Sequence, residues 1–543
     1  MTELYRIDNK IASLNKIFNN KKSFLLMSGI VCFLLYALRT PEDLFKPYLW
    51  AEDGSLFISD TLFSPLSSFL DTCNGSFSVL QRLLTLICYI PCYIANDITY
   101  LPIIMGVLFK LFAVIGILYF TSDRFAWLIE SRIWRLAVCI FVILTIPPTA
   151  YDLVTCDASL PHVLLFTVYL IGLRLVCVKD SILEWDESII VFFVAFSSAA
   201  APFMGLIGMC HIAKTLMQAK NGDSNSCTSL NVLKGVIVLI PVILQCRNIL
   251  NSSRVSTELQ LFDRLLLNTK NFVFFPFWQY YHRWIFFIVG LGLWFIIMKS
   301  ASVNPKFLIY SCACSFFYML YCSMTVSELE RIYGGNMVGR FIYLNVALAA
   351  LMLGVAAYCF WEKGSRSLWT MGIAGIVLLL AIPGYRYIID VKGTEYSDLY
   401  AMSSVAFTRY GDEVAFIPVG PGGSWEMKIP VSLKIESAYQ DLIVEIRSDE
   451  TGVTDIRGIP RKLASGGTLV VDAHLNGSKL RNLFFQQEDG VYQSTWTAVD
   501  EGKYSFLTPK SSLSEGYDIG TMKTLIFYGQ SEDGAIHRCV IDL

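Results

Sequence analysis

Long apolar runs alternate with short polar stretches over the first 390 residues of the chain, and the pattern then changes. About 20 apolar residues span a bilayer as one helix. The runs indicate a polytopic α-helical membrane protein with about 9–11 transmembrane helices. The predicted segments are 23–39, 78–95, 100–121, 136–150, 160–178, 188–217, 231–247, 283–299, 306–324, 341–361 and 368–387.

Two of these segments carry a proline in their interior. If 78–95, which contains Pro91, crossed fully, the arginines of loop 122–135 would lie outside, whereas Lys and Arg gather in cytoplasmic loops. We therefore expect 78–95 to be interfacial or non-crossing. Pro202 interrupts 188–217, which we interpret as two short helices forming a hairpin. The outward regions are then 40–77, 151–160, 248–282, 325–340 and everything after 387.

From Val414 onward, short β-rich runs replace the apolar stretches, and Gly, Asn, Asp and Pro clusters separate them. The pattern predicts a C-terminal extracytoplasmic antiparallel β-sandwich domain of ~130 residues. Strands are expected at Val431–Ile435, Leu442–Ile446, Thr468–Val471 and Leu525–Tyr528. The expected domains are a cytoplasmic N-terminal segment at 1–22, a transmembrane domain at 23–390 and a β-rich domain at 391–543.

Composition supports a membrane environment. Hydrophobic residues make up 54% of the chain and charged residues only 16%, whereas about a quarter of the residues of a soluble domain are charged. The first apolar segment follows a basic stretch and precedes no cleavage site, which indicates a signal anchor. Membrane lipid is therefore an expected partner. The net charge is −2 and no basic block stands out, so nucleic acid is not.

The sharpest local motif is Trp50-Ala51-Glu52-Asp53-Gly54 in the first outward loop. Two adjacent carboxylates precede a glycine between apolar flanks, which predicts a position near the membrane surface. Partial burial raises the pKa of a carboxyl group and makes it a better general base. The competing interpretation is a solvated turn in which Asp53 caps a helix.

The second outward loop and the helix after it supply Asp152, Asp157, Ser159 and His162. A second acid facing the first would suit the recognition of hydroxyl groups or the binding of a divalent ion. Asp157 is also in position to cap the following helix, and His162 to be an ordinary packing residue. No ligand spacing in the chain specifies a metal.

Arginines are the candidate anion-binding groups. Arg331 lies in loop 325–340, and Arg340 immediately precedes an apolar helix. The planar fork of an arginine at that depth pairs with a lipid phosphate, and the alternative is an interfacial anchor that reaches the headgroups. Arg82 and Lys110 have apolar sequence neighbours, where a charge is costly and indicates function, although Lys110 also suits a bundle interior.

The order of these motifs resembles that of the polytopic GT-C glycosyltransferases. An N-terminal helix precedes the Glu52-Asp53 loop, and Gly75, Arg82, an acidic outer loop and Phe196-Ser-Ser-Ala-Ala-Ala-Pro-Phe203 follow. More narrowly, the chain resembles the bacterial O-antigen glucosyltransferases that modify lipopolysaccharide and convert serotype. The resemblance covers the layout of residues 20–390.

The resemblance implies an inverting transfer of a sugar, expected to be glucose, from a polyprenyl-phosphate donor. The implied acceptor is the O-antigen of lipopolysaccharide or its lipid-linked precursor, on the periplasmic face of the bacterial inner membrane. Glu52 or Asp53 would be the general base. The implied substrate-binding residues are Asp152, Asp157, His162, Arg82, Arg331 and Arg340, with the arginines holding the leaving phosphate. Members of the family work with or without a divalent metal, so this cofactor stays open.

Two other function classes are consistent with a membrane protein of this kind. A transporter or flippase of lipid-linked saccharide predicts inverted repeats and charges near the midplane. The sequence has no internal repeat, and its acidic residues cluster in the outer loops. A structural or receptor-like protein would bind a partner through the β-domain, which leaves the Glu52-Asp53 loop without a role.

Overall fold

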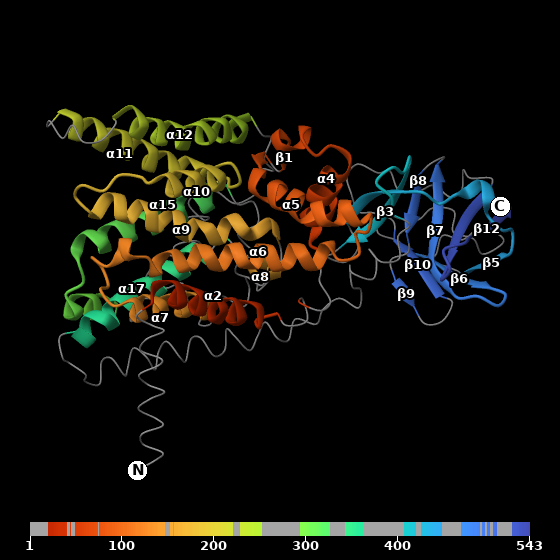
Figure 1. Ribbon diagram of the computed structural model, residues 1–543, viewed down its shortest axis with the longest axis horizontal. Helices are drawn as coiled ribbons and strands as arrows, with labels where there is room; N and C mark the ends of the chain where they lie inside the picture. Colours follow the sequence, from red (N-terminus) through yellow and green to blue (C-terminus); the bar gives the residue numbers. More distant parts are fainter. Residues whose placement is uncertain are drawn as a thin grey trace, which may run out of the picture.

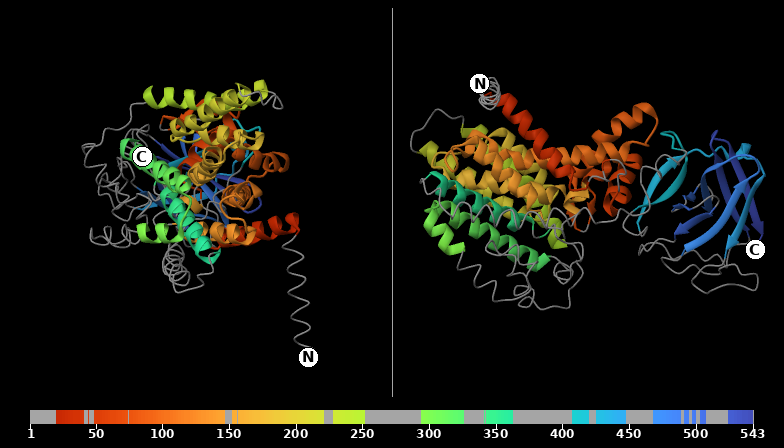
Figure 2. Two further views of the ribbon diagram at one scale, coloured as in Figure 1. Left: turned by 90° about the vertical axis from the view of Figure 1, so that its left-hand side faces the viewer. Right: turned by 90° about the horizontal axis from the view of Figure 1, so that it is seen from below.

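The molecule is elongated, with a helical bundle at one end and a β-sheet domain at the other (Figure 1, Figure 2). We call the end of the bundle that meets the sheets the β-domain end. The computed structural model describes residues 20–40, 44, 49–73, 75–146, 152–155, 157–220, 228–251, 294–325, 341, 343–362, 407–419, 425–447, 468–488, 491–494, 497–499, 503–507 and 524–542.

Most of the predicted apolar segments coincide with helices. Segment 368–387 and most of 283–299 lie outside the described residues. The main helices are α2 (Lys21–Ala37), α5 (Val79–Ala95), α6 (Leu101–Leu118), α7 (Arg132–Leu144), α9 (Leu160–Cys177), α10 (Trp185–Ala195), α11 (Ala201–Lys220), α12 (Thr228–Asn251), α15 (Pro305–Thr325) and α17 (Tyr343–Glu362).

Among the described residues, four helical spans are long and apolar enough to cross a membrane. They fit a polytopic membrane protein, because in lipid a helix satisfies its own backbone hydrogen bonds. α5 is shorter and is not among them. The four spans are Leu101–Thr121, Asp157–Cys177, Ser229–Asn251 and Tyr343–Glu362.

Helix α9 lies at the centre of the bundle. Its residues are apolar on all sides, and 83% of its most apolar window is buried, as expected of a helix surrounded by others. It contacts α6, α10, α11, α15 and α17. Because Asp157 belongs to the short 3₁₀ helix η6 (Asp157–Ser159) directly before α9, the second predicted loop is anchored to the most buried helix.

The segment 188–217 is interrupted, as its proline predicted. α10 ends at Ala195, and α11 begins at Ala201 with Pro202 in its first turn. The break packs on the start of α5, where the N–H of Leu80 donates to Ser197 Oγ at 2.7 Å. The motif 196–203 therefore supports the helix that carries Arg82.

The loops divide between the two ends of the bundle (Figure 1). Lys21 pairs with Asp123 at 3.1 Å and Arg124 with Asp186 at 2.7 Å, so the loops predicted to be cytoplasmic gather at the end away from the sheets. The described parts of loops 40–77 and 151–160 lie together at the β-domain end. This segregation matches the one predicted from the basic residues.

Two sheets form the C-terminal domain. The six-stranded sheet has the order β12-β11-β7-β8-β3-β4 and the four-stranded sheet β5-β6-β10-β9. Buried residues of both sheets share one core, which makes the domain a sandwich. The strands are β3 (Glu413–Val419), β4 (Trp425–Val431), β5 (Leu442–Arg447), β6 (Thr468–Leu475), β7 (Leu480–Glu488), β8 (Val491–Ser494), β9 (Thr497–Val499), β10 (Lys503–Leu507), β11 (Thr524–Ser531) and β12 (Ile536–Asp542).

Two details of the strand prediction are wrong. The sandwich is not wholly antiparallel, because β3 pairs with β8 in parallel. The long stretch of chain between these strands gives ample room for the crossover that parallel pairing requires. A strand does not run through Val431–Ile435: β4 ends at Val431, and Lys434 adopts a left-handed φ of 50° before a 3₁₀ turn. The strands expected near Leu442, Thr468 and Leu525 are present.

Candidate functional site

Asp53 joins the two acidic loops. It begins the π-helix η1 (Asp53–Ile58), and its side chain is only 1% exposed. Its Oδ2 accepts the backbone N–H groups of Trp50 and Asp157, each at 3.1 Å, and its Oδ1 accepts that of Ala158 at 2.9 Å. A carboxylate that holds three N–H donors from two loops fixes those loops relative to each other. The two acidic loops therefore meet at Asp53.

The charge of Asp53 is held in an unfavourable place. The pKa of Asp53 is raised to about 7, mainly by burial and also by the neighbouring charge of Glu52, while the three N–H groups act in the opposite direction. A base with a pKa near 7 suits general-base catalysis. The side chain is nevertheless almost inaccessible, and both of its oxygens accept backbone N–H groups. Asp53 therefore acts as a tether that holds the two loops together.

Glu52 is arranged differently from its neighbour. Its side chain is half-buried, and its Oε2 atom is buried without a hydrogen-bond partner. An unsatisfied carboxylate oxygen is costly, by about 1–3 kcal/mol or more. Such atoms are rare in folded proteins and call for an explanation. A proton donor from outside the chain, such as the hydroxyl of a substrate, would supply the missing partner.

Two uncharged residues near the point where Asp53 joins the two loops also have a buried polar atom without a hydrogen-bond partner. Gln81, on α5, donates from Nε2 to the carbonyl of Ala158 at 3.2 Å, while its Oε1 has no partner. Ser159 is fully buried, and its hydroxyl also has none. Gln81 was not predicted, because a single Gln carries no compositional signal, and Ser159 was named only as one polar residue of the second outward loop. Their positions next to Arg82 and two residues after Asp157 were the only hint.

Arg82 is paired within the protein. Its side chain is 3% exposed, and its Nε and Nη2 both reach Asp60 Oδ2, at 3.1 and 2.7 Å. Its Nη1 donates to the carbonyl of Asp71 at 2.5 Å. The guanidinium thereby anchors the first loop to α5, and Asp60 already neutralises its charge. Its predicted contact with a phosphate stays a prediction.

The other predicted residues lie in the same region or outside the described residues. Asp157 is buried and lines a small cavity together with Lys110. Ser159, not Asp157, is the N-cap residue of α9. His162, in the first turn of α9, packs edge-on against Phe341 with ring centroids 5.2 Å apart.

The structure gives no account of the remaining three predicted residues as ligands. Asp152 begins the short helix α8 (Asp152–Thr155), which is described by its backbone. Arg331 and Arg340 lie outside the described residues.

A metal ion does not fit the described acids. In the parts of the chain that the structure describes, no three His, Cys, Asp or Glu side chains gather around a common point. Both oxygens of Asp53 face N–H donors, and a cation would need those oxygens turned toward it. We derive no chemical step from a divalent ion.

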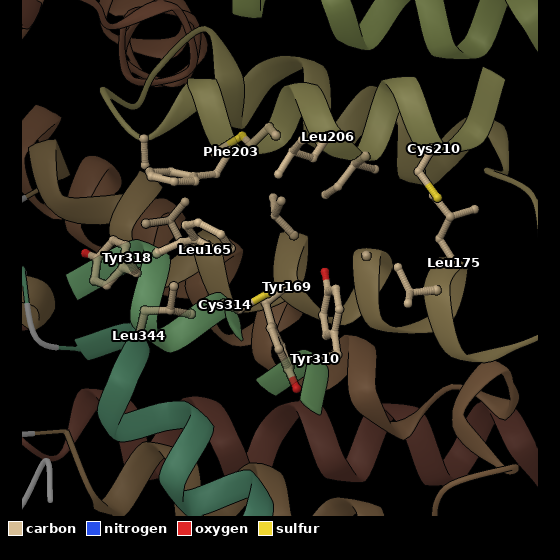
Figure 3. Close-up of a pocket in the computed structure, with 17 residues that line it drawn as sticks. Leu165, Tyr169, Leu175, Phe203, Leu206, Cys210, Tyr310, Cys314, Tyr318 and Leu344 are labelled. Atoms are coloured by element: carbon tan, nitrogen blue, oxygen red, sulfur yellow. The ribbon is translucent and has the colours of Figure 1, made fainter. Parts of the chain in front are cut away.

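An apolar cavity of about 140 Å³ lies between α9, α11 and α15 (Figure 3). Phe203, Leu165 and Tyr318 lie toward one side of it and Cys210 and Leu175 toward the other. Its α9 lining begins at Leu165, eight residues after Asp157, which is about 12 Å along a helix. The cavity is thus close enough to the junction of the two loops to hold an apolar part of a ligand bound there.

A second constellation, in the β-domain, has the connectivity of a catalytic triad. His537 Nδ1 lies 2.6 Å from Asp441 Oδ1, and its Nε2 lies 3.3 Å from Ser531 Oγ. Ser531 is only 2% exposed and also bonds to Asp533 and to the carbonyl of Ala535. Because the Ser531 hydroxyl is already engaged by these partners, the three residues tie the β11–β12 hairpin to the start of β5.

Comparisons of the chain with protein families, with curated proteins and with solved structures find no match.

Proposed function

We propose that the chain is a membrane glycosyltransferase of the GT-C type, acting on a lipid-linked sugar at the β-domain end of the bundle. The proposed reaction transfers a sugar, in the first instance glucose, from a polyprenyl-phosphate donor. The proposed acceptor is a hydroxyl of the O-antigen of lipopolysaccharide or of its lipid-linked precursor. The proposed location is the bacterial inner membrane, with the site on the periplasmic face.

The observation that carries this proposal is the buried, unpartnered Oε2 of Glu52 beside a rigid junction of two loops. Sugar acceptors are weak nucleophiles, and a positioned carboxylate accelerates their attack by about 10²–10⁴-fold. Glu52 has a free oxygen for the acceptor proton, whereas the oxygens of Asp53 accept backbone N–H groups. We therefore assign the base to Glu52 and a positioning role to Asp53.

Gln81 and Ser159 supply further groups suited to a sugar. Each has a buried polar atom without a partner, and both adjoin Ala158, whose N–H is held by Asp53. Sites built from buried polar groups discriminate strongly in favour of ligands that complete their hydrogen bonds. A polyhydroxylated ligand would satisfy Glu52, Gln81 and Ser159 together, with Asp157 and His162 as the neighbouring candidates.

The donor requires an apolar site and a positive charge. The cavity between α9, α11 and α15 offers an apolar lining for part of a polyprenyl chain. Arg340 and Arg331 are the proposed ligands of the leaving phosphate, because fixed positive charge stabilises a developing phosphate anion. Arg82 is the weaker candidate, since Asp60 already neutralises it.

In the proposed step, the acceptor oxygen attacks the anomeric carbon from the face opposite the phosphate. The acceptor proton moves to Glu52, the new C–O bond forms, and the bond between the anomeric carbon and the phosphate oxygen breaks. The bonding pair leaves with the polyprenyl phosphate, so the anomeric configuration inverts.

The test is transfer of radiolabelled glucose from polyprenyl-phosphate glucose to lipopolysaccharide or its lipid-linked precursor, in membranes containing the protein. Glu52→Gln should reduce turnover by about 10²-fold or more without lowering the melting temperature. Glu436→Gln changes an exposed glutamate of the β-domain and should leave transfer unchanged.

Full activity of Glu52→Gln would remove Glu52 as the base. Absence of transfer by the well-expressed wild type, with glucose and with other polyprenyl-phosphate sugars, would contradict the transferase. Movement of a fluorescent lipid-linked saccharide across vesicles under those conditions would instead indicate a flippase.

A further inference from the structure

The β-domain meets one end of the bundle (Figure 1, Figure 2), where its strand β4 contacts η1, the π-helix that begins at Asp53. β4 is an edge strand of the six-stranded sheet, and it contacts η1 and the short helix α4 (Ser59–Phe63). A single buried apolar cluster crosses this boundary. From the bundle it includes Leu49, Ile58, Cys88, Cys92, Ile98, Leu101 and Met105, and from the sheet Ala415, Ile417, Val419, Met427, Ile429 and Val431.

Gly54 is the point of closest approach. A Cβ atom at this position would lie 2.9 and 3.2 Å from the two Cγ atoms of Val419 and 3.4 Å from Met427 Cβ. The backbone of Gly54 lies in helical geometry, so no left-handed φ requires the glycine. The side chain is absent because the β3–β4 hairpin occupies the space. The glycine of the Glu-Asp-Gly motif is therefore explained by packing against the β-domain.

A hydrogen-bonded bridge accompanies this packing. The N–H of Lys428, on β4, donates to Ser59 Oγ at 2.9 Å, and Ser59 Oγ donates to the carbonyl of Gly54 at 3.0 Å. The widened turn of a π-helix leaves carbonyl groups in need of such partners, and π-turns often occur at functional sites. The bridge links the backbone of η1 directly to the edge of the sheet.

The same hairpin region also holds α5, the helix of Gln81 and Arg82. Arg409, just before β3, donates from Nη1 to the carbonyl of Tyr93 at 3.0 Å, and its N–H donates to Asn96 Oδ1 at 3.2 Å. Its guanidinium lies 4.9 Å from the centre of the Tyr93 ring. The β-domain thus contacts η1, which directly follows Glu52, and α5, which carries Gln81.

We infer that the β3–β4 hairpin is a positioning element for the Glu52-Asp53 loop, acting through the contact of Val419 with Gly54. The domain does more than cover the bundle, because its edge strand sets where η1 lies. The expected effect on turnover rests on the proposed function. The structural claim, that contact with Val419 holds η1 in place, does not depend on the proposed function and is tested by a measurement of its own.

The test uses Gly54→Ala, Val419→Ala and the double variant in the full chain. Gly54→Ala should lower kcat by about 10–100-fold with little change in donor KM, since a displacement of about 1 Å can cost that much. Val419→Ala alone loosens the contact without displacing η1, so it should lower kcat less than Gly54→Ala does. The double variant should return to the level of Val419→Ala, because the missing methyl groups make room for the added one. Gly29→Ala is the control, since a Cβ there meets nothing within 4 Å.

Hydrogen–deuterium exchange of peptides covering 49–63 provides the readout that needs no activity. Exchange should rise in Gly54→Ala and return in the double variant. Unchanged exchange in Gly54→Ala would overturn the inference, as would a loss of turnover that Val419→Ala does not restore. If the wild type transfers no sugar but exchange follows the expected pattern, the transferase is contradicted and the positioning contact stands.

Discussion

The carboxylates of Asp123 and Glu52, at opposite ends of the helical bundle, differ in their partners. At the end away from the sheets, Asp123 accepts from Lys21 at 3.1 Å, from Arg132 at 2.9 Å and from Arg135 at 3.4 Å. Arg124 pairs there with Asp186 at 2.7 Å. At the β-domain end, Glu52, Gln81 and Ser159 each keep a buried polar atom without a partner.

We interpret this difference as that between a carboxylate that holds the fold and a carboxylate that binds a ligand. The hydrogen bonds and charges of Arg132 and Lys21 lower the pKa of Asp123 to about 2, as expected of a carboxylate whose charge is compensated. Unsatisfied buried atoms cost stability, and in natural proteins such costs concentrate at functional sites. The following predictions test this contrast.

The largest effect is expected for Asp53→Asn. An amide offers one acceptor oxygen in place of two, so at least one N–H of Trp50, Asp157 or Ala158 would face an NH₂ group. The free energy of unfolding should fall by about 1–3 kcal/mol, and transfer should fall with it. Thermal unfolding in detergent, beside the exposed control Asp412→Asn, measures this. Loss of transfer at unchanged stability would make Asp53, rather than Glu52, the base.

The second prediction concerns the pH dependence of stability. Because burial raises the pKa of Asp53 from 3.8 to about 7, the folded state binds more protons than the unfolded state between these values. Stability should therefore fall as pH rises from about 4 to about 7 and level off above that. Burial also raises the pKa of Glu426 to about 7, which contributes with the same sign.

The contribution of Asp53 is obtained as a difference. Melting temperatures of wild type and Asp53→Asn, recorded at about pH 5, 6, 7 and 8, should converge as pH rises if the ionised aspartate is the strained form. A constant difference across this range would show that the pKa of Asp53 is not raised.

A smaller effect is expected for Ser159→Ala. The Ser159 hydroxyl has no partner within the protein, so its removal should leave the melting temperature unchanged or slightly higher. The KM for the sugar substrate should rise by about threefold to tenfold, which corresponds to one lost hydrogen bond of about 1 kcal/mol. A lower melting temperature with an unchanged KM would make Ser159 an ordinary core residue.

The smallest effect is expected for Asp123→Asn at the opposite end. Asp123 is about half exposed, with a side-chain accessibility of 47%, and exposed ion pairs contribute about 0–1 kcal/mol. Stability should change by no more than that, and transfer should stay at the wild-type rate. Loss of turnover in Asp123→Asn without loss of stability would show that Asp123 takes part in function and does not only hold the fold.

Much of the architecture could be predicted from local patterns. The apolar runs located helices such as α6, α9 and α12, and Pro202 located the break between α10 and α11. Basic residues sorted the loops between two ends. The strand pattern failed near Val431, where a left-handed residue ends the run, because the alternation of side chains does not register a single backbone turn.

The sequence by itself determined that the chain has a helical apolar part, a β-rich C-terminal part and a pair of acids in its first outward loop. Only the tertiary structure decided that Asp53 is a tether, that Arg82 pairs with Asp60, and that Gly54 makes room for Val419. Hydropathy is a property of neighbours along the chain. Hydrogen-bond partners and close approaches join residues that are distant in sequence, and they exist only once the two loops and the sheet have come together.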